Sequence, residues 1–113
     1  MSSYRFIERI SDPMLSATVS TLTQTIPLIL TSMASVSFQF NYGAGLNATF
    51  QILGSLDGVN YSDMNAVIPP ATGSAGSSIG NVDTGAIKYA LAQITPTSGS
   101  AIVTVLGRAA SRP

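Results

Sequence analysis

The chain lacks cysteine, histidine and tryptophan throughout its 113 residues. Without cysteine there are no disulfides, no zinc–thiolate sites and no thiol catalysis, and the redox compartment stays open. Without histidine the chain loses the commonest general base near neutral pH and the commonest ligand of transition metals. These two absences argue against an enzyme, and the lack of tryptophan weakens a site that binds sugars by stacking.

Charge is also scarce. Charged residues make up 9% of the chain and its net charge is zero, whereas ordinary soluble domains carry roughly 25% charged residues. Between residues 13 and 107 the charged positions are Asp57, Asp63, Asp83 and Lys88. A body with so few charges has little attraction for nucleic acid or anionic lipid, so we expect neither as a partner. So low a charge is typical of a protein whose surface is covered by further copies of the same chain or by other subunits, although Ser, Thr and Asn can also solvate a surface.

The sequence gives no sign of export or of membrane insertion. Its first twelve residues contain no apolar core of signal-peptide length. The longest apolar run, residues 26–30, is interrupted by Pro27 and is far shorter than the roughly 20 residues of a spanning helix. We therefore expect no membrane association.

Alternation of apolar and polar residues predicts β-strands. Val36, Phe38, Phe40 and Tyr42 alternate with small polar residues, which is the pattern of a half-buried strand. Glycines at 43 and 45 and the Asp57–Gly58 pair predict turns on either side of a second such strand. The expected strands cover residues 16–23, 27–32, 36–42, 48–56, 60–68, 77–83, 86–95 and 101–106.

Several details of these elements can be predicted. The strand at 60–68 should be anchored by Tyr61, Met64 and Val67, and a loop rich in Gly and Ser should follow it. Residues 96–99 should form a turn, and the last strand should be buried on both faces. Seven or eight strands with turn signals at roughly ten-residue spacing predict an all-β fold, an antiparallel and jelly-roll-like β-sandwich.

The first twelve residues are predicted to form an N-terminal arm, and residues 13–113 to form the β-sandwich domain. In the arm, Tyr4, Phe6, Ile7 and Ile10 are interleaved with charged residues. Phe6 and Ile10 have the spacing of a short amphipathic turn, which the residue before Pro13 would end. The arm is either a poorly ordered terminus or a segment whose four apolar residues contact a neighbouring subunit.

No group of residues amounts to an active site, and we predict no catalytic, cofactor-binding or metal-binding residue. Asp57, Asn60 and Asp63 lie close together and suggest a calcium site, but two carboxylates are few and these are ordinary turn residues. A Ser–Lys pair would need Lys88, which is better explained as a surface residue. Whether the aspartates bind calcium is left open, and a structural turn is the preferred interpretation.

Three tyrosines could offer a surface on which a sugar or a base stacks: Tyr42, Tyr61 and Tyr89. Their phase within the expected strands assigns Tyr42 and Tyr89 to the core or to an interface. In the strand that holds Tyr89, Ile87, Tyr89 and Leu91 should share one face.

Part of the sequence resembles the small β-sandwich virion proteins of tailed and other bacteriophages. Their typical order is a strand ending in S-x-D-G-x-x-W/Y, then K/R-Y-hydrophobic, then T-P-T-S-G-x-G/A and a final strand. The matching positions are Ser55, Asp57, Gly58, Tyr61, Lys88, Tyr89, Thr95, Pro96, Thr97, Ser98 and Gly99. The likeness covers about residues 36–107, and it departs from the pattern in having Tyr61 instead of Trp and alanines after Tyr89.

The resemblance implies a structural role in a particle and transfers no catalytic residue. We expect a homo-oligomer in contact with other virion proteins, made in the host cytoplasm and located in the virion as a capsid, decoration, spike or fibre-base component. The alternative is a module that binds carbohydrate or a host-surface glycan, since β-sandwiches often carry such sites. No cofactor is expected for either function.

Overall fold

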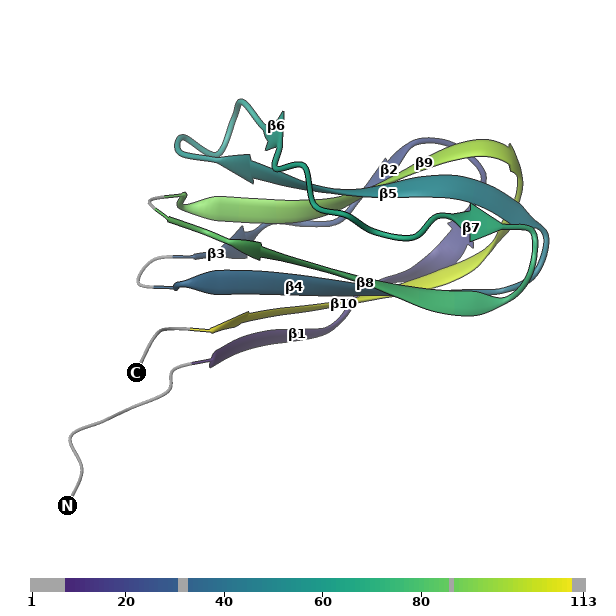
Figure 1. Cartoon of the computed structure of the whole chain (residues 1–113), viewed down its shortest axis with the longest axis horizontal. Coiled ribbons are helices and arrows are strands. Elements are labelled where there is room, and N and C mark those ends of the chain that lie inside the picture. Colours follow the sequence, from purple (N-terminus) through teal and green to yellow (C-terminus); the bar gives the residue numbers. More distant parts are fainter. Residues whose placement is uncertain (1–7, 31–32, 86, 111–113) are drawn as a thin grey trace, which may run out of the picture.

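The computed structural model describes residues 8–30, 33–85 and 87–110. The regular structure in these ranges is entirely β: β1 (Glu8–Val19), β2 (Thr23–Gln24), β3 (Leu28–Ile29), β4 (Ser35–Tyr42), β5 (Leu46–Ser55), β6 (Ser62–Asp63), β7 (Ala71–Thr72), β8 (Gly76–Asp83), β9 (Tyr89–Gly99) and β10 (Ala101–Ala110). Sheet A has the order β1-β10-β4-β8, and sheet B has the order β2-β9-β5-β6, with β3 beside β9 and β7 beside β5 (Figure 1). The predicted antiparallel β-sandwich is confirmed. Within the described ranges no helix is long and apolar enough to cross a membrane.

The two sheets are one antiparallel ribbon that folds over on itself. In sheet A, β4 pairs with β10 as far as Tyr42↔Val103, and in sheet B the same two chain segments resume pairing as β5 and β9 at Leu46↔Gly99. On one flank β8 and β7 follow β4 and β5, and on the other β1, β2 and β3 follow β10 and β9. The chain segments therefore keep one order in both sheets, which is the principle of a jelly-roll-like sandwich.

Glycines with positive φ lie along the fold of the ribbon. Gly45, Gly73 and Gly99 have φ values of 103°, 96° and 75°, a region that other L-residues rarely adopt. The Gly45 amide donates to the Gly73 carbonyl oxygen at 2.9 Å, and the Gly73 amide donates to that of Leu46 at 2.9 Å. The turn predicted at residues 43–45 is thus present, and it is the place where the chain passes from sheet A to sheet B.

The turn predicted at residues 96–99 is wrong, because β9 continues through this segment to Gly99. The register of β5 and β9 shifts between Asn47 and Ala48, and Pro96 is the partner of Ala48 beside that shift. A β-bulge tolerates proline, which cannot donate a ladder hydrogen bond. The chain then crosses to sheet A at Ser100.

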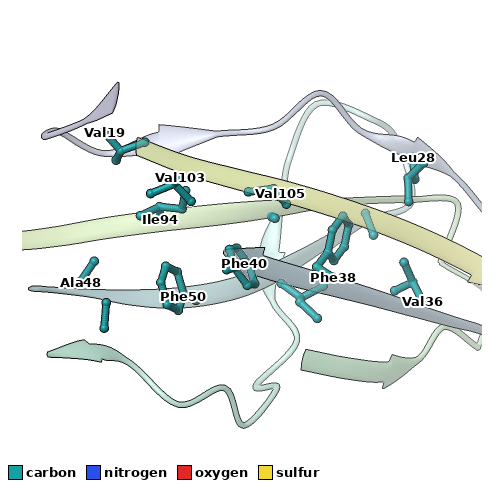
Figure 2. Close-up of a cluster of buried hydrophobic side chains, with 14 of the residues drawn as sticks. Val19, Leu28, Val36, Phe38, Phe40, Ala48, Phe50, Ile94, Val103 and Val105 are labelled. Atoms are coloured by element: carbon teal, nitrogen blue, oxygen red, sulfur yellow. The ribbon is translucent and has the colours of Figure 1, made fainter. Parts of the chain in front are cut away.

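The core lies between the two sheets and follows the predicted alternation in β4. Phe38 and Phe40 are fully buried, and the Phe40 ring stacks on Phe50 of the opposite sheet with centroids 4.4 Å apart (Figure 2). The small side chains of Ala90 and Ala92 face this core from β9 and are also fully buried. The alanines that depart from the virion-protein pattern therefore lie where β9 meets the core.

The segment between β6 and β7 runs along one open side of the sandwich (Figure 1). Met64, Ala66 and Ile68 pack against the core, whereas Val67 is 94% exposed. The strand predicted at residues 60–68 is wrong except at Ser62–Asp63, and Val67 is not an anchor. The reason is local: the strand ends at Asp63, and Asn65, two residues later, has a positive φ of 59° that an extended strand does not allow.

The first and last strands also differ from expectation. β10 is not buried on both faces, since its residues alternate and Ile102 is 63% exposed. β1 begins at Glu8, whose partner is Ala110, so residues 8–12 belong to an extended strand and not to an amphipathic turn. The domain boundary predicted at residue 12 falls inside this strand, and the pairing shifts register around Pro13, between Ser11 and Leu15.

Other strand boundaries differ from the predicted ones by a few residues. The strand expected at residues 16–23 is the end of β1 together with β2, and the strand expected at 27–32 is observed at Leu28–Ile29. Pro27 lies directly before that short strand, the position a proline was expected to take. The weak strand expected at 77–83 is present as β8.

Candidate interaction surfaces

The turn after β5 is held together by one carboxylate and one hydroxyl. Asp57 Oδ1 accepts hydrogen bonds from the backbone amides of Val59 and Asn60, both at 2.8 Å, and from Ser55 Oγ at 2.8 Å. Asp57 Oδ2 accepts a bond from Asn60 Nδ2 at 2.9 Å. Ser55 Oγ in turn accepts the amides of Asp57 and Gly58. Bonds from the Asn60 and Val59 amides, then from the Asn60 and Ser55 side chains, hold the pKa of the Asp57 carboxyl far below its usual range.

These contacts bear on the calcium site that the sequence suggested. Asp57 is saturated by donors of its own turn, and Asp63 accepts the Asn65 amide on one oxygen and Gln51 Nε2 on the other. A calcium ligand must offer free oxygen lone pairs. Among the described residues, no group of three or more acidic, histidine or cysteine residues could hold a metal. Both carboxylates accept hydrogen bonds from nearby backbone amides, which is the geometry of a structural turn.

The outer face of sheet B carries a chain of side-chain hydrogen bonds that crosses four strands. Gln24 Nε2 donates to Gln93 Oε1 at 2.7 Å, Gln93 Nε2 donates to Gln51 Oε1 at 2.8 Å, and Gln51 Nε2 donates to Asp63 Oδ2 at 3.1 Å. Amides that bond to each other in this way satisfy their own polarity without charge. The sequence analysis missed this ladder, because it needs the pairing of β2, β9, β5 and β6, which no local pattern reveals.

An aromatic slot lies on the same face, closer to the Ser55–Asn60 turn. It is a hollow of about 380 Å³ lined by Pro27, Ile29, Asp57, Gly58, Tyr61 and Tyr89. The hydroxyl oxygen of Tyr61 is buried and has no hydrogen-bond partner among the described residues, and burial raises the pKa of this phenol, with Tyr89 and Asp57 adding to the shift. A buried and unpaired hydroxyl can gain by binding a group that hydrogen-bonds to it.

The three tyrosines therefore lie in two different environments. Tyr42 packs against the core, with its ring centroid 5.5 Å from that of Phe50, as its phase predicted. Tyr89 and Leu91 do share a face, but it is the outer face of sheet B, since Ala90 between them belongs to the core. Ile87 does not share this face, because its side chain packs against the core. Tyr61 and Tyr89 are the pair that meets in the aromatic slot.

The outer face of sheet A is mostly polar, but it carries the exposed Ile102 and a row in which two aliphatic side chains flank a glutamine. Ile79 of β8, Gln39 of β4 and Leu106 of β10 are register partners in this row. A hollow of about 260 Å³ lies over it and also touches Ser37 and Arg108. Ile79 is 57% exposed although it lies on an edge strand, a position where natural sheets usually place polar or charged residues.

The predicted subunit contacts lie mostly beyond what the structure describes. Tyr4, Phe6 and Ile7 are outside the described residues. Ile10 belongs to β1, where its backbone is the register partner of Arg108. The role of these four residues stays a prediction.

Exposed aliphatic side chains are numerous on the described surface. They occur on both sheets and on the turns between strands: Leu22, Ile26, Ile29, Leu56, Val59, Val67, Ile79 and Ile102, each more than half exposed. Lys88, which was considered as a catalytic base, is exposed on the chain that enters β9, and its amide donates to the Ser55 carbonyl oxygen. The surface therefore offers apolar contact area with very little charge to oppose burial.

No protein-family model and no curated protein matches the sequence. The structure is similar to that of the SPBc2 prophage-derived protein YomS, with a TM-score of 0.72 and 8% identity over 98% of this chain and 99% of that one. It is also similar to a chain in the structure of infectious bursal disease virus, Gx strain, with a TM-score of 0.65 and 13% identity over 98% of this chain and 34% of that one. At such low identities the two neighbours establish a shared fold.

Proposed function

We propose that this chain is a non-enzymatic structural component of a bacteriophage particle and that it acts by self-assembly. The observation that carries the proposal is the combination of a nearly uncharged β-sandwich with many exposed aliphatic side chains. Such a surface gains free energy when it is buried, at roughly 25 cal/mol for each Å² of apolar area, and it needs little charge neutralisation.

The fold supports the same function. One structural neighbour derives from a prophage and the other belongs to a virus, and the sequence resembles phage virion proteins in its turns. A capsid, decoration, spike or fibre-base position would suit such a subunit equally. The arm residues Tyr4, Phe6, Ile7 and Ile10 would add contacts to a neighbouring subunit in any of these positions.

A second function is favoured by the aromatic slot. We infer a carbohydrate-binding role as the alternative, because Tyr61 and Tyr89 line a hollow and the Tyr61 hydroxyl has no partner within the part of the chain that the structure describes. Sugars combine apolar ring faces with hydroxyl groups, and aromatic side chains with hydrogen-bonding groups suit both. A spike or tail-tip protein could have both functions.

Self-assembly is tested by size-exclusion chromatography with light scattering over a wide range of protein concentration. We expect a mass that is a multiple of 11.6 kDa, and we expect the protein in purified particles of the phage that encodes it, detected by mass spectrometry. A monomer at all concentrations that is also absent from particles would refute the proposal. A glycan array tests the carbohydrate-binding alternative. Binding of a glycan to the parent chain that is lost in Tyr89→Ala would support the aromatic slot as the binding site.

A further inference from the structure

The two long edge strands of the described sandwich, β1 and β8, are protected to very different degrees. The edges of sheet B are formed by strands of two residues each, so they offer little backbone for pairing. β1 carries Glu8, Arg9 and Asp12, and Pro13 lies where its register shifts. Charge, proline and irregular register are the devices by which proteins keep edge strands from pairing.

β8 has none of these devices along most of its length. Its eight residues, GSSIGNVD, contain no proline, and Asp83 at the last position is the single charge. Its pairing with β4 is regular from Tyr42↔Gly76 to Ser35↔Asp83. Its other side is an edge of sheet A, to which no described strand is bonded. A long, regular, uncharged edge strand is a template for another strand.

We propose that two copies of this chain pair along β8 in antiparallel orientation, so that sheet A of one copy continues into sheet A of the other. This inference deepens the self-assembly proposed above and rests on it. The interface would join two four-stranded sheets into one sheet of eight strands through backbone hydrogen bonds. Those bonds satisfy the edge amides and carbonyls that water satisfies in the single copy.

The side chains of β8 fit a second copy because they are arranged symmetrically about Ile79. In an isologous pair each residue meets its counterpart across a two-fold axis. With the axis at Ile79, this residue lies opposite itself, and Ser77 lies opposite Asn81 of the second copy. Those three side chains all point to the outer face of sheet A and are exposed. The match sets apolar against apolar and hydroxyl against amide, with Asp83 far from its own counterpart.

The row of side chains that contains Ile79 supports the same partner. Ile79 and Leu106 flank Gln39 in this row, since the three residues are register partners. A two-fold axis at Ile79 would continue the row into the second copy. Pairing along β8 would thereby cover the Ile79 side chain of each chain, which is 57% exposed in the single copy.

Cysteine cross-linking tests the pairing directly, because the chain has no cysteine of its own. Directly opposed residues of antiparallel strands have Cα atoms about 4.5–5.5 Å apart, a distance that a disulfide can span. Ile79→Cys should therefore form a covalent dimer on mild oxidation. The matched control is Ile102→Cys, which places an equally exposed cysteine on the same face but on the inner strand β10, and it should stay monomeric on a denaturing gel.

A charge-swap experiment tests the register. Ile79→Lys places two like charges opposite each other and removes the two isoleucine side chains that the dimer would bury. The dissociation constant of the dimer should therefore rise roughly 100-fold or more. Ile79→Glu should do the same. An equimolar mixture of the two variants should recover a heterodimer, while Ile102→Lys should leave the association of the parent chain unchanged.

The outcomes separate this inference from the proposed function. Efficient cross-linking at position 79 and recovery in the mixture support pairing through β8. Association that survives Ile79→Lys overturns it and leaves self-assembly standing. Loss of association in a variant with Tyr4→Ser and Phe6→Ser, with no effect at position 79, would overturn it in favour of the N-terminal segment. A chain that is monomeric at all concentrations overturns the pairing through β8, and it overturns the proposed function as well when the protein is also absent from purified particles.

Discussion

Gly99 and Gly45 meet at the corner of the folded ribbon with no space for a side chain between them. A Cβ atom on Gly99 would collide with the carbonyl oxygen of Gly45. Both residues also have positive φ, 75° and 103°. This contact lies where two chain segments pass together from one sheet to the other, so the close approach of the two backbones holds the sheets in their relative position.

Gly99→Ala should lower the free energy of unfolding by about 3 kcal/mol, because it adds a backbone collision to the strain of a left-handed alanine. The matched control is Gly85→Ala: its φ is also positive, at 56°, but no atom of the described residues, its chain neighbours aside, lies within 4 Å of the added Cβ. This control should cost only about 1 kcal/mol. Urea unfolding followed by circular dichroism measures both, and equal losses in the two variants would contradict the role of the Gly45 contact.

A second close approach joins β8 to the segment between β6 and β7. A Cβ on Gly80 would lie 2.5 Å from Cδ1 of Ile68. Gly80→Ala should therefore destabilise the chain by about 1–3 kcal/mol through overpacking. Ile68→Ala should also destabilise it, since it empties part of the core.

The double variant distinguishes this contact from two independent effects. In Gly80→Ala with Ile68→Ala, the new methyl occupies space that the isoleucine leaves, so the loss should be smaller than the sum of the single losses by about 1 kcal/mol. Additive losses would show that the segment moves aside at no cost. Because Gly80 belongs to β8, the oligomeric state of each variant must be measured at the same concentration.

The stacked rings of the core give a third prediction. Phe50→Ala should cost about 3–5 kcal/mol, because it opens a cavity between the sheets. The pair Phe40→Leu and Phe50→Leu should show a coupling of about 0.5–1.5 kcal/mol in a double-mutant cycle, since the rings stack across the sheets. Phe38→Leu with Phe50→Leu serves as the comparison. A coupling as large in that pair would mean that general packing, and not ring stacking, accounts for the effect.

The parts of the fold that could be predicted are those set by local chemistry. The alternation in β4 and β5 follows from residues two apart, and the turns at Gly45 and Gly58 follow from glycine and aspartate preferences. All of them are present. Pro96 shows where local chemistry misleads: it predicts a turn in isolation, but the pairing of β9 with β5 takes it up in a bulge.

The candidate surfaces depend on pairing between distant segments, so the sequence could not reveal them. The ladder from Gln24 to Asp63 needs four strands in one register, and the aromatic slot needs Tyr61 beside Tyr89. That the exposed Ile79 lies on an edge strand follows only from the order of the strands in sheet A. Val67 is wrong as an anchor because Met64, Ala66 and Ile68 face the core, and Val67 lies between two of them with its side chain exposed.

The turn at Asp57 makes a prediction about pH. Four hydrogen bonds favour the charged carboxylate in the folded chain, so its folded pKa lies below that of the unfolded chain, which is about 3.9. The unfolded state then binds the proton more readily. The stability that this residue contributes is present above about pH 4 and is lost as the pH falls from there toward the folded pKa.

Asp57→Asn should remove that dependence. The variant should be less stable than the parent at pH 7. The difference should shrink between about pH 4 and pH 2, because over this range the parent loses the stability that comes from its charged carboxylate, which the variant lacks. Asn60→Ala provides the matched control: it removes one side-chain donor but keeps the two backbone amides that contribute most to the shift, so it should retain most of the slope. Urea unfolding at several pH values measures all three chains. A stability difference between parent and Asp57→Asn that stays constant down to pH 2 would contradict the assigned hydrogen bonds.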